Sequence, residues 1–295
     1  MNPTPNSKNQ FQHQTENSNT TSSIPENKGK IKELGNEEQT QGLRISTGSA
    51  EFDQFLRGGY EKGVITTIYG PAGSGKTNLM LLALASAAKQ GKKIIYIDTE
   101  ANFSLERLMQ ISPEYKQVLN NTLLFRPTTF EMQHQEIVML ASKLTHDIGL
   151  IIVDSIGALY RLEWGKESTN QTNKQLSIQF AKLAELASKQ QIPVLLTNQV
   201  YASFEDKESV HIVGGDIVNY ASKALLELKK TKTGRIALIK KHRSLPEHSH
   251  FLFKIVEEGI EAVKKDEGKK DEQDNAQKKD NEATKKTAQR FSSYE

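Results

Sequence analysis

The feature that most constrains this chain is an eight-residue segment, 70–77, with the pattern Gly, four variable residues, Gly, Lys and Ser or Thr. An apolar run, 64–69, precedes it and a helix-like run, 78–89, follows it, which is the strand–loop–helix setting that a phosphate-binding loop requires. Glycines tolerate positive φ and carry no Cβ, so backbone N–H groups can turn inward onto a triphosphate, helped by the positive end of the following helix. The expected nucleotide-binding residues are Gly70, Pro71, Ala72, Gly73, Ser74, Gly75, Lys76 and Thr77.

Two side chains at the end of this loop have separate expected roles. Lys76 is placed to reach the outer phosphates, and the Thr77 hydroxyl is placed to hold Mg²⁺. The competing interpretation is a Gly-rich turn that matches the pattern by chance. The apolar run before the loop and the helix-like run after it favour the phosphate-binding interpretation.

Composition separates a central region from the two ends of the chain. About 40 N-terminal residues are rich in Asn, Gln, Ser and Thr, and from Glu261 onward nine Lys or Arg residues balance nine Asp or Glu residues. Such segments bury too little apolar surface to offset the entropy of ordering. We therefore expect disorder at 1–42 and 263–295, and one folded α/β domain over 43–262.

Composition also excludes several classes of protein. The chain has no cysteine, which excludes disulfides, zinc–thiolate sites and a cysteine nucleophile, and its net charge is only +3. It shows no apolar stretch typical of a signal peptide and no run near the roughly 18 apolar residues that a bilayer-spanning helix needs. We expect a soluble cytoplasmic protein without membrane contact.

Apolar residues along the central region predict strands that alternate with helices. Short apolar or β-branched runs bounded by polar residues are typical of buried strands, and apolar residues recurring on one face are typical of amphipathic helices. We expect strands at 94–97, 123–125, 150–153, 193–197, 224–228, 235–240 and 251–256, and helices at 79–88, 131–145 and 177–190. This order predicts an α/β fold with a mostly parallel central sheet flanked by helices and an antiparallel C-terminal extension.

An acidic residue ends the strongest predicted strand. Asp154 follows the apolar run 150–153. The carboxyl ends of parallel strands lie at the same edge as the phosphate loop, so this carboxylate could hold Mg²⁺ directly or through water. The alternative is an Asp that caps the next segment. The phosphate loop upstream favours the metal role, which makes Thr77 and Asp154 the predicted Mg²⁺ residues.

Two further strand ends carry polar side chains that suit hydrolysis. Asp98 and Glu100 end one strand and share a face because side chains alternate, so either could orient and deprotonate an attacking water. Gln199 lies just beyond the end of the strand at 193–197, where its amide could sense the outermost phosphate. Taken alone, these residues leave ordinary strand-end and turn chemistry equally open.

Two loops, 160–174 and 201–215, follow these strand ends and mix aromatic with cationic residues. Arg161, Trp164 and Lys166 in the first loop suit single-stranded nucleic acid, through stacking and phosphate contacts. An ordinary polar surface remains open as the interpretation of both loops. The second loop and the residue after it also carry acidic side chains that oppose a polyanion, namely Glu205, Asp206, Glu208 and Asp216.

A basic cluster lies within the predicted strands that extend the sheet. It could contact DNA phosphates, or it could place a cation on the terminal phosphate bound by a neighbouring subunit, like an arginine finger. A solvated hairpin is a third interpretation, since charge runs are often only that. The cluster comprises Lys229, Lys230, Lys232, Arg235, Lys240, Lys241, His242 and Arg243, of which Lys240, Lys241 and Arg243 are the predicted DNA contacts.

Taken in order, these motifs resemble a RecA-family ATPase, and within that family the archaeal paralogues of the recombinase RadA. The resemblance covers about 44–262. The single motifs are common, but their order and spacing are not. The resemblance is carried by 46–59, 70–77, 96–100, 197–199, 213–215, 241–247 and 255–260.

The resemblance implies a RecA-like core that binds ATP with Mg²⁺ and hydrolyses it weakly. The segment 96–100 is similar to the one whose glutamate activates water, so Glu100 is the implied catalytic base beside Lys76. The segment 197–199 is similar to the one that couples the terminal phosphate to DNA-binding loops, which gives that role to Gln199. The implied partners are single-stranded or branched DNA, the recombinase RadA and a Holliday-junction resolvase, with self-association left open.

Departures from the full recombinases change the implied function. Those proteins carry a helical N-terminal DNA-binding domain and an aromatic-x-x-Ala peptide for polymerisation, and neither is found before this core. They also cap the neighbour's ATP with Asp and Pro, where this chain has Lys241 and Arg243. We therefore expect an accessory or regulatory protein of DNA repair and homologous recombination. The alternatives are an active strand-exchange recombinase and a KaiC-like signalling ATPase without a nucleic-acid role.

Overall fold

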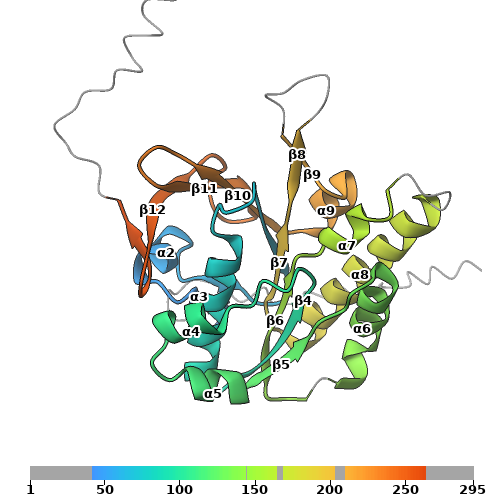
Figure 1. The fold of residues 1–295 in the computed structure, drawn as a ribbon, viewed down its shortest axis with the longest axis horizontal. Coiled ribbons are helices and arrows are strands. Elements are labelled where there is room, and N and C mark those ends of the chain that lie inside the picture. The colour runs from blue at the N-terminus through green and yellow to red at the C-terminus, as the bar shows by residue number, and fades with distance from the viewer. Residues whose placement is uncertain (1–41, 144, 165–168, 203–209, 264–295) are drawn as a thin grey trace, which may run out of the picture.

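A nine-stranded sheet runs through the computed structural model, which describes residues 42–143, 145–164, 169–202 and 210–263 (Figure 1). The predicted disordered ends lie outside these residues, apart from positions 42 and 263. Across the sheet the strands are β13 (Gly259–Ala262), β12 (His250–Val256), β11 (Arg235–Lys241), β10 (Ala224–Lys230), β3 (Ile65–Tyr69), β7 (Val194–Asn198), β6 (Ile148–Asp154), β4 (Lys93–Asp98) and β5 (Thr122–Phe125).

The pairing of the strands confirms the predicted fold class. The six strands from β10 to β5 pair in parallel, and the pairs β10–β11, β11–β12 and β12–β13 are antiparallel. The parallel part brings the carboxyl ends of β3, β4, β6 and β7 to one edge, which is where ligands bind in open α/β sheets. The C-terminal strands extend the sheet beside β3.

Helices cover both faces of the sheet (Figure 1). Successive side chains of a strand point to opposite faces of the sheet, which gives the sheet two apolar faces. In β4, Ile94 and Tyr96 belong to one core cluster, and Ile95 and Ile97 belong to the other. One face carries α2 (Ala50–Phe55), α3 (Lys76–Lys89), α4 (Leu105–Ile111) and α5 (Tyr115–Asn120); the other carries α6 (Phe130–Lys143), α7 (Ala158–Arg161), α8 (Thr169–Gln190) and α9 (Gly215–Ala221).

Both segments predicted as loops contain regular structure. The first of them, 160–174, includes the end of α7 and the start of α8, a helix that begins at Thr169 rather than at 177. Buried Thr172 and Leu176 continue its apolar face, which the polar residues around them conceal in the sequence. The second segment, 201–215, includes the end of β8 (Val200–Ala202), all of β9 (Val210–Ile212) and the first residue of α9; β8 and β9 pair antiparallel.

The segment before the phosphate loop packs against the antiparallel extension. It contains β1 (Arg44–Ile45), α2 and β2 (Tyr60–Glu61). The Asp53 carboxylate accepts hydrogen bonds from Thr47 N at 2.6 Å and from Ser46 Oγ at 2.6 Å, which closes the turn before α2. Gly59 has φ 104°, and a Cβ on it would lie 1.9 Å from the Ile45 carbonyl oxygen, so this turn requires glycine. Among the described residues, no helix is both long and apolar enough to cross a bilayer.

Replacing Phe52 with Ala should destabilise the core. The ring is 0% exposed, and its centroid lies 5.7 Å from that of Phe55, 6.5 Å from Tyr60 and 5.3 Å from Phe251. Loss of a packed buried ring costs about 3–5 kcal/mol of unfolding free energy. Urea unfolding followed by far-UV circular dichroism measures it. Tyr220→Ala is the control, because Tyr220 is 79% exposed; equal losses in the two variants would contradict the packing described.

Candidate nucleotide and nucleic-acid sites

The segment 70–77 forms the loop after β3 and, at Lys76 and Thr77, the first residues of α3, which confirms its predicted strand–loop–helix setting. Lys76 is 9% exposed, and its ammonium group donates to the carbonyl oxygens of Gly70 at 2.9 Å and Pro71 at 3.0 Å. Gly70 has φ 156°, and a Cβ on it would lie 2.4 Å from the Leu228 carbonyl oxygen. The loop therefore packs closely against β10, with Lys76 folded back over it.

A buried acidic residue joins the loop to three other elements. Asp154, at the end of β6, is 2% exposed and accepts hydrogen bonds from the side chains of Tyr96 (2.9 Å) and Thr197. Burial raises the pKa of Asp154, and hydrogen bonds from Thr197, Thr77 and Tyr96 act against that rise. The predicted pair of Thr77 and Asp154 thus lies together. Their oxygen atoms are of the kind that Mg²⁺ prefers.

The two acidic residues at the end of β4 and just beyond it occupy different environments. Asp98 is 1% exposed, and its carboxylate accepts from the backbone N–H groups of Asn102 at 3.0 Å and Phe103 at 3.2 Å. Glu100 is half-buried, and its charge opposes the fall that burial imposes on the pKa of Lys76. Asp98 therefore closes a turn, whereas Glu100 acts electrostatically on the phosphate loop.

The end of β7 links the nucleotide side to the β8–β9 hairpin. Thr197 contacts Asp154, and the buried amide of Asn198 donates to the Val213 carbonyl oxygen at 2.7 Å. The backbone oxygen of Gln199 accepts from Val213 N at 3.1 Å, and its side chain is half-buried. A change beside Asp154 can therefore reach Val213, near the end of the second loop, through consecutive residues of β7 and Gln199.

Trp164 contacts the stem of the second loop. Its ring is nearly perpendicular to the rings of Tyr160 and Tyr201, with centroid distances of 6.1 Å and 5.1 Å. The Tyr201 ring centroid in turn lies 5.7 Å from the His211 ring centroid. Trp164 is 39% exposed, and Arg161 is exposed. The other predicted contact in this loop, Lys166, lies outside the described residues, as do the acidic residues Glu205, Asp206 and Glu208.

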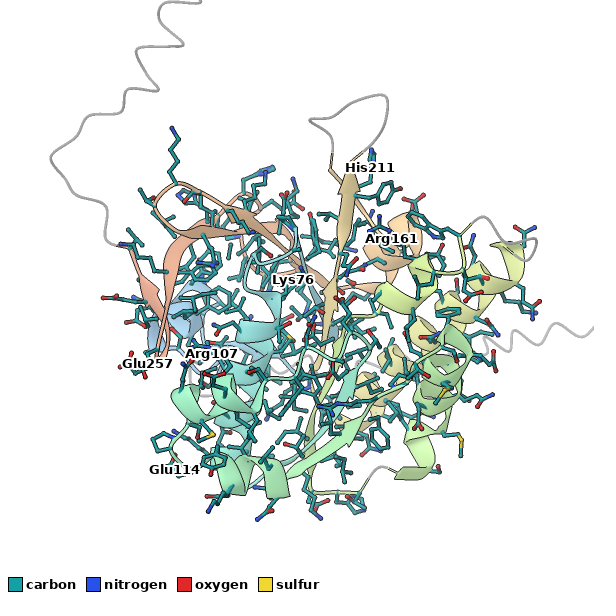
Figure 2. The ribbon with its side chains drawn as sticks, viewed as in Figure 1. Lys76, Arg107, Glu114, Arg161, His211 and Glu257 are labelled. Atoms are coloured by element: carbon teal, nitrogen blue, oxygen red, sulfur yellow. The ribbon has the colours of Figure 1, made fainter. Side chains whose placement is uncertain are left out.

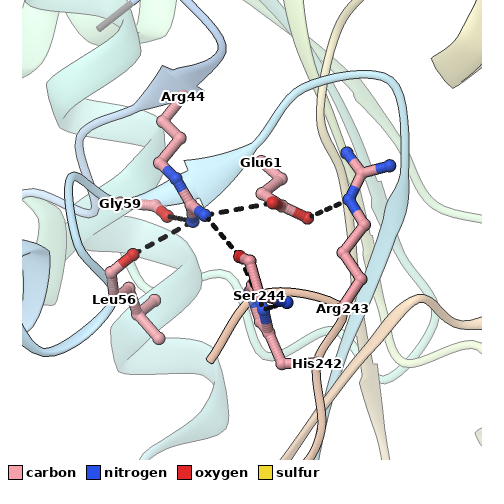
Figure 3. A network of polar contacts seen from close by, with 7 residues as sticks. All are labelled: Arg44, Leu56, Gly59, Glu61, His242, Arg243 and Ser244. Carbon is pink, nitrogen blue, oxygen red and sulfur yellow. Dashed lines mark hydrogen bonds and ion pairs between the residues drawn. The ribbon is translucent and has the colours of Figure 1, made fainter. Parts of the chain in front are cut away.

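Each predicted DNA contact on β11 and just beyond it has a partner within the chain. Lys241 donates to the Asn219 carbonyl oxygen at 2.6 Å, and Lys240 lies 3.9 Å from a Glu227 oxygen. Arg243 Nε donates to Glu61 at 2.9 Å (Figure 3). Lys240 and Lys241 also line a cavity of about 730 Å³ whose walls include Tyr69, Tyr201, His211 and Tyr220.

Glu61 is the centre of a network between β2 and the residues after β11 (Figure 3). Its two carboxylate oxygens accept from Arg44 at 3.0 Å and from Arg243 at 2.9 Å. Arg44 also donates to Ser244 Oγ at 3.1 Å and to the carbonyl oxygens of Leu56 and Gly59. Arg243 therefore anchors the basic segment to the domain in addition to presenting charge.

One residue near the loop carries a role that sequence reasoning missed. Arg107, on α4, donates to Asn78 Oδ1 at 2.7 Å and to the carbonyl oxygens of Val256 at 2.7 Å, Glu257 at 2.8 Å and Gly259 at 3.1 Å. Figure 2 shows Arg107 beside Glu257. The arginine thus ties the β12–β13 turn to the first turn of α3. No local sequence signal marks it, because three of its partners are backbone oxygens.

This combination of a phosphate loop, polar strand ends at one sheet edge and an antiparallel extension defines a RecA-like P-loop protein. A model of the Rad51 family matches residues 38–263. The chain belongs to the Rad51 family, and its relatives there include RadB proteins. The resemblance to archaeal recombinase paralogues that the sequence indicated is confirmed.

Two relatives and one solved structure show how far the similarity extends. The DNA repair and recombination protein RadB of Methanobrevibacter smithii is 40% identical over 238 residues, covering 78% of this chain and 100% of the relative. RadB of Methanoculleus marisnigri is 42% identical over 226 residues, covering 75% and 98%. A crystal structure of the RadB recombinase has a TM-score of 0.64 at 35% identity and covers 75% of this chain and 100% of that chain.

Replacing Glu61 with Gln should cost more stability than replacing Arg243 with Ala. The Glu61 side chain is 9% exposed between two cations, and removing one partner of a buried ion pair costs about 3–5 kcal/mol. The Arg243 side chain is 57% exposed, and an exposed partner contributes about 0–1 kcal/mol. Urea unfolding of both variants tests this order. Equal, small losses would show that the Glu61 network does not stabilise the fold.

Proposed function

We propose that this chain is an ATP-binding and DNA-binding accessory protein of DNA repair and homologous recombination, with weak ATPase activity. One observation carries the nucleotide-binding part: buried polar atoms around the phosphate loop lack partners. Ser74 Oγ and Asn78 Nδ2 are buried and accept or donate no hydrogen bond within the described part of the chain. An unsatisfied buried polar group costs about 1–3 kcal/mol, and a polyphosphate supplies acceptors that would remove this cost.

The residues at the loop suit ATP with Mg²⁺. Bound Mg·ATP supplies a phosphoryl group whose charge the metal partly neutralises. Thr77 and Asp154 would hold the metal through their oxygen atoms, and Lys76 would exchange its bonds to the Gly70 and Pro71 carbonyls for bonds to phosphate. The backbone N–H groups of 70–77 and the start of α3 would bind the remaining phosphate oxygens.

Glu100 is the proposed catalytic base. It lies beyond the end of β4 and acts electrostatically on both Lys76 and Asp154, so it faces the same site as the phosphates. Its carboxylate would orient a water molecule in line with the terminal phosphate and accept its proton. Asp98 is not available for this role, because backbone N–H groups occupy its carboxylate.

Residues at the end of β7 would transmit the presence or absence of the terminal phosphate to the DNA-binding loops. Gln199 is the proposed sensor of the terminal phosphate, and Thr197 is joined to Asp154, so both ends of this short segment respond to the same ligand. Val213, which directly follows β9, accepts a hydrogen bond from the Asn198 side chain and donates one to the Gln199 carbonyl oxygen. ATP would thereby favour one arrangement of the loop stems over another.

Single-stranded or branched DNA is the proposed nucleic-acid partner. The chemistry suits it because aromatic rings and lysines line one cavity, where bases could stack while cations bind phosphates. The proposed contacts are Arg161, Trp164, Lys166, Lys240, Lys241 and Arg243. An accessory role is favoured over strand exchange because Lys241 and Arg243 already have partners in the same chain. The recombinase RadA and a Holliday-junction resolvase are the proposed protein partners.

Replacing Glu100 with Gln should separate binding from hydrolysis. We expect the Kd for ATP to change less than about threefold, while turnover falls about 10²- to 10⁴-fold, the contribution typical of a general base. Calorimetric titration measures the first quantity and phosphate release the second. Unchanged turnover would assign the base to another residue.

Lys76→Ala is the reference variant for this comparison. It removes the ammonium group, and we expect its ATP affinity to fall at least about 100-fold, equivalent to about 2.7 kcal/mol. Retained affinity in Lys76→Ala would refute the nucleotide site itself, whatever Glu100→Gln shows.

ATP should change the affinity of the chain for DNA. Trp164 is the only tryptophan of the chain and lies against the stem of the second loop, so its fluorescence reports on DNA there. We expect tighter binding of single-stranded DNA with a non-hydrolysable ATP analogue than without it, by about 5- to 150-fold, the usual range of coupling. The titration is repeated across a salt series. Equal affinity in both states at every salt concentration would contradict the proposed switch.

A further inference from the structure

The β10–β11 hairpin extends beyond the sheet edge beside the phosphate loop. β10 pairs with β3 up to Glu227, opposite Tyr69, and then continues to Lys230 without β3 beside it. Lys230 and Arg235 are cross-strand partners at the end of the hairpin. The turn between them is closed by hydrogen bonds between Thr231 and Gly234. The geometry of the hairpin therefore fixes where these two cations lie.

Both cations reach the glycines of the loop. A Cβ built on Gly73 would lie 2.9 Å from Lys230 Nζ. A Cβ built on Gly75 would lie 3.5 Å from Arg235 Cδ and 3.8 Å from Arg235 Nε. Any side chain at Gly73 would displace the lysine, so the glycine there has a second purpose besides backbone freedom. It leaves room for a cation from another strand.

Neither cation has a counter-charge in the described part of the chain. Arg235 Nε is buried and has no hydrogen-bond partner there, and no carboxylate lies within ion-pair distance of Lys230 or Arg235. Their neighbours differ, because Lys229 and Lys240 lie 3.4 Å and 3.9 Å from Glu227 oxygens. Burial lowers the pKa of Lys76, and the nearby positive charge of Lys230 contributes further to that fall.

Three positive charges thus converge on one short loop of the chain. Glu100 and Asp154 offset part of the charge of Lys76, but Lys230 and Arg235 add two positive charges that have no matching anion in the described residues. Bringing these charges together costs free energy, and a bound polyanion would offset that cost. We infer that Lys230 and Arg235 bind the phosphate chain of the nucleotide held by the loop of the same chain, an inference that rests on the proposed ATP binding. The two residues act as a cationic clamp that closes over the loop from β10 and β11.

The clamp would complete the nucleotide site with residues of a single chain. The cations come from the chain that holds the nucleotide, so the charge on the phosphates is neutralised without a residue from a neighbouring subunit. The attraction grows with the charge of the nucleotide, so the clamp favours ATP over ADP and ADP over AMP. Lys230 and Arg235 are therefore residues that select for triphosphate.

Neutral variants of the two residues test the clamp. Arg235→Gln should raise the Kd for ATP about tenfold or more, the loss expected for a charge-assisted hydrogen bond, and Lys230→Gln about fivefold because Lys230 is exposed. Lys229→Gln is the matched control, since Lys229 is on the same hairpin but faces Glu227, and it should change the Kd less than about twofold. The loss should be largest for ATP and smallest for AMP. Unchanged Kd values, or equal losses for all three nucleotides, would overturn the inference.

Two further readouts separate this role from a structural one. Nucleotide-free Arg235→Gln should unfold at the same temperature as the wild type within about 2 °C, while the increase in Tm caused by ATP becomes smaller. Arg235→Lys should recover part of the ATP affinity, because it restores the charge. A variant that unfolds early without nucleotide and binds all nucleotides equally weakly would show a structural role and overturn the inference.

Mixing variants distinguishes a clamp within one chain from one between chains. Lys76→Ala chains keep the hairpin but lack the phosphate-binding lysine, so they are added in excess to Arg235→Gln chains. A clamp within the chain predicts no recovery of ATP binding, whereas recovery would assign Arg235 to a neighbouring site. If wild-type chain itself binds no ATP, the proposed function fails; if it binds ATP and the two Gln variants bind equally well, only the clamp fails.

Discussion

The buried carboxylate of Asp154 is the contact on which the rest of the site depends. It ends the central strand β6 and accepts hydrogen bonds from Tyr96 on β4 and Thr197 on β7, and Thr77 of the phosphate loop is also hydrogen-bonded to it. A charge in such a place is costly unless donors surround it. Those donors hold three neighbouring strand ends and the loop in one register. The edge of the sheet is therefore set before any ligand arrives.

Around the phosphate loop, in contrast, positive charge is in excess and some buried polar atoms lack partners. Lys76, Lys230 and Arg235 bring positive charge to it, and buried atoms of Ser74 and Asn78 lack hydrogen-bond partners within the described residues. A polyphosphate bound with a divalent cation, as proposed, would supply both the negative charge and the missing hydrogen-bond partners. The free energy of binding would then come partly from relief of these costs, which would link affinity for the ligand to the stability of the fold.

Local sequence patterns predicted the parts of this protein that depend on neighbours in the chain. The phosphate loop, the strand before it and the position of Asp154 follow from short motifs and period-two or helical patterns. Contacts between distant residues left no such pattern: Arg107 reaches Val256, 149 positions away, and Glu61 pairs with Arg243, 182 positions away. The start of α8 at Thr169 was also hidden, because polar residues dominate its first two turns. Such features appear only once packing has brought the elements together.

A crystal structure of the chain with Mg²⁺ and a non-hydrolysable ATP analogue would test the proposed nucleotide site directly. We expect a triphosphate bound by the backbone N–H groups of 70–77, a metal ion between Thr77 and Asp154, and Lys76 bonded to phosphate instead of to the Gly70 and Pro71 carbonyls. A loop that stays empty at saturating analogue, or a nucleotide bound elsewhere with Lys76 still on those carbonyls, would contradict it.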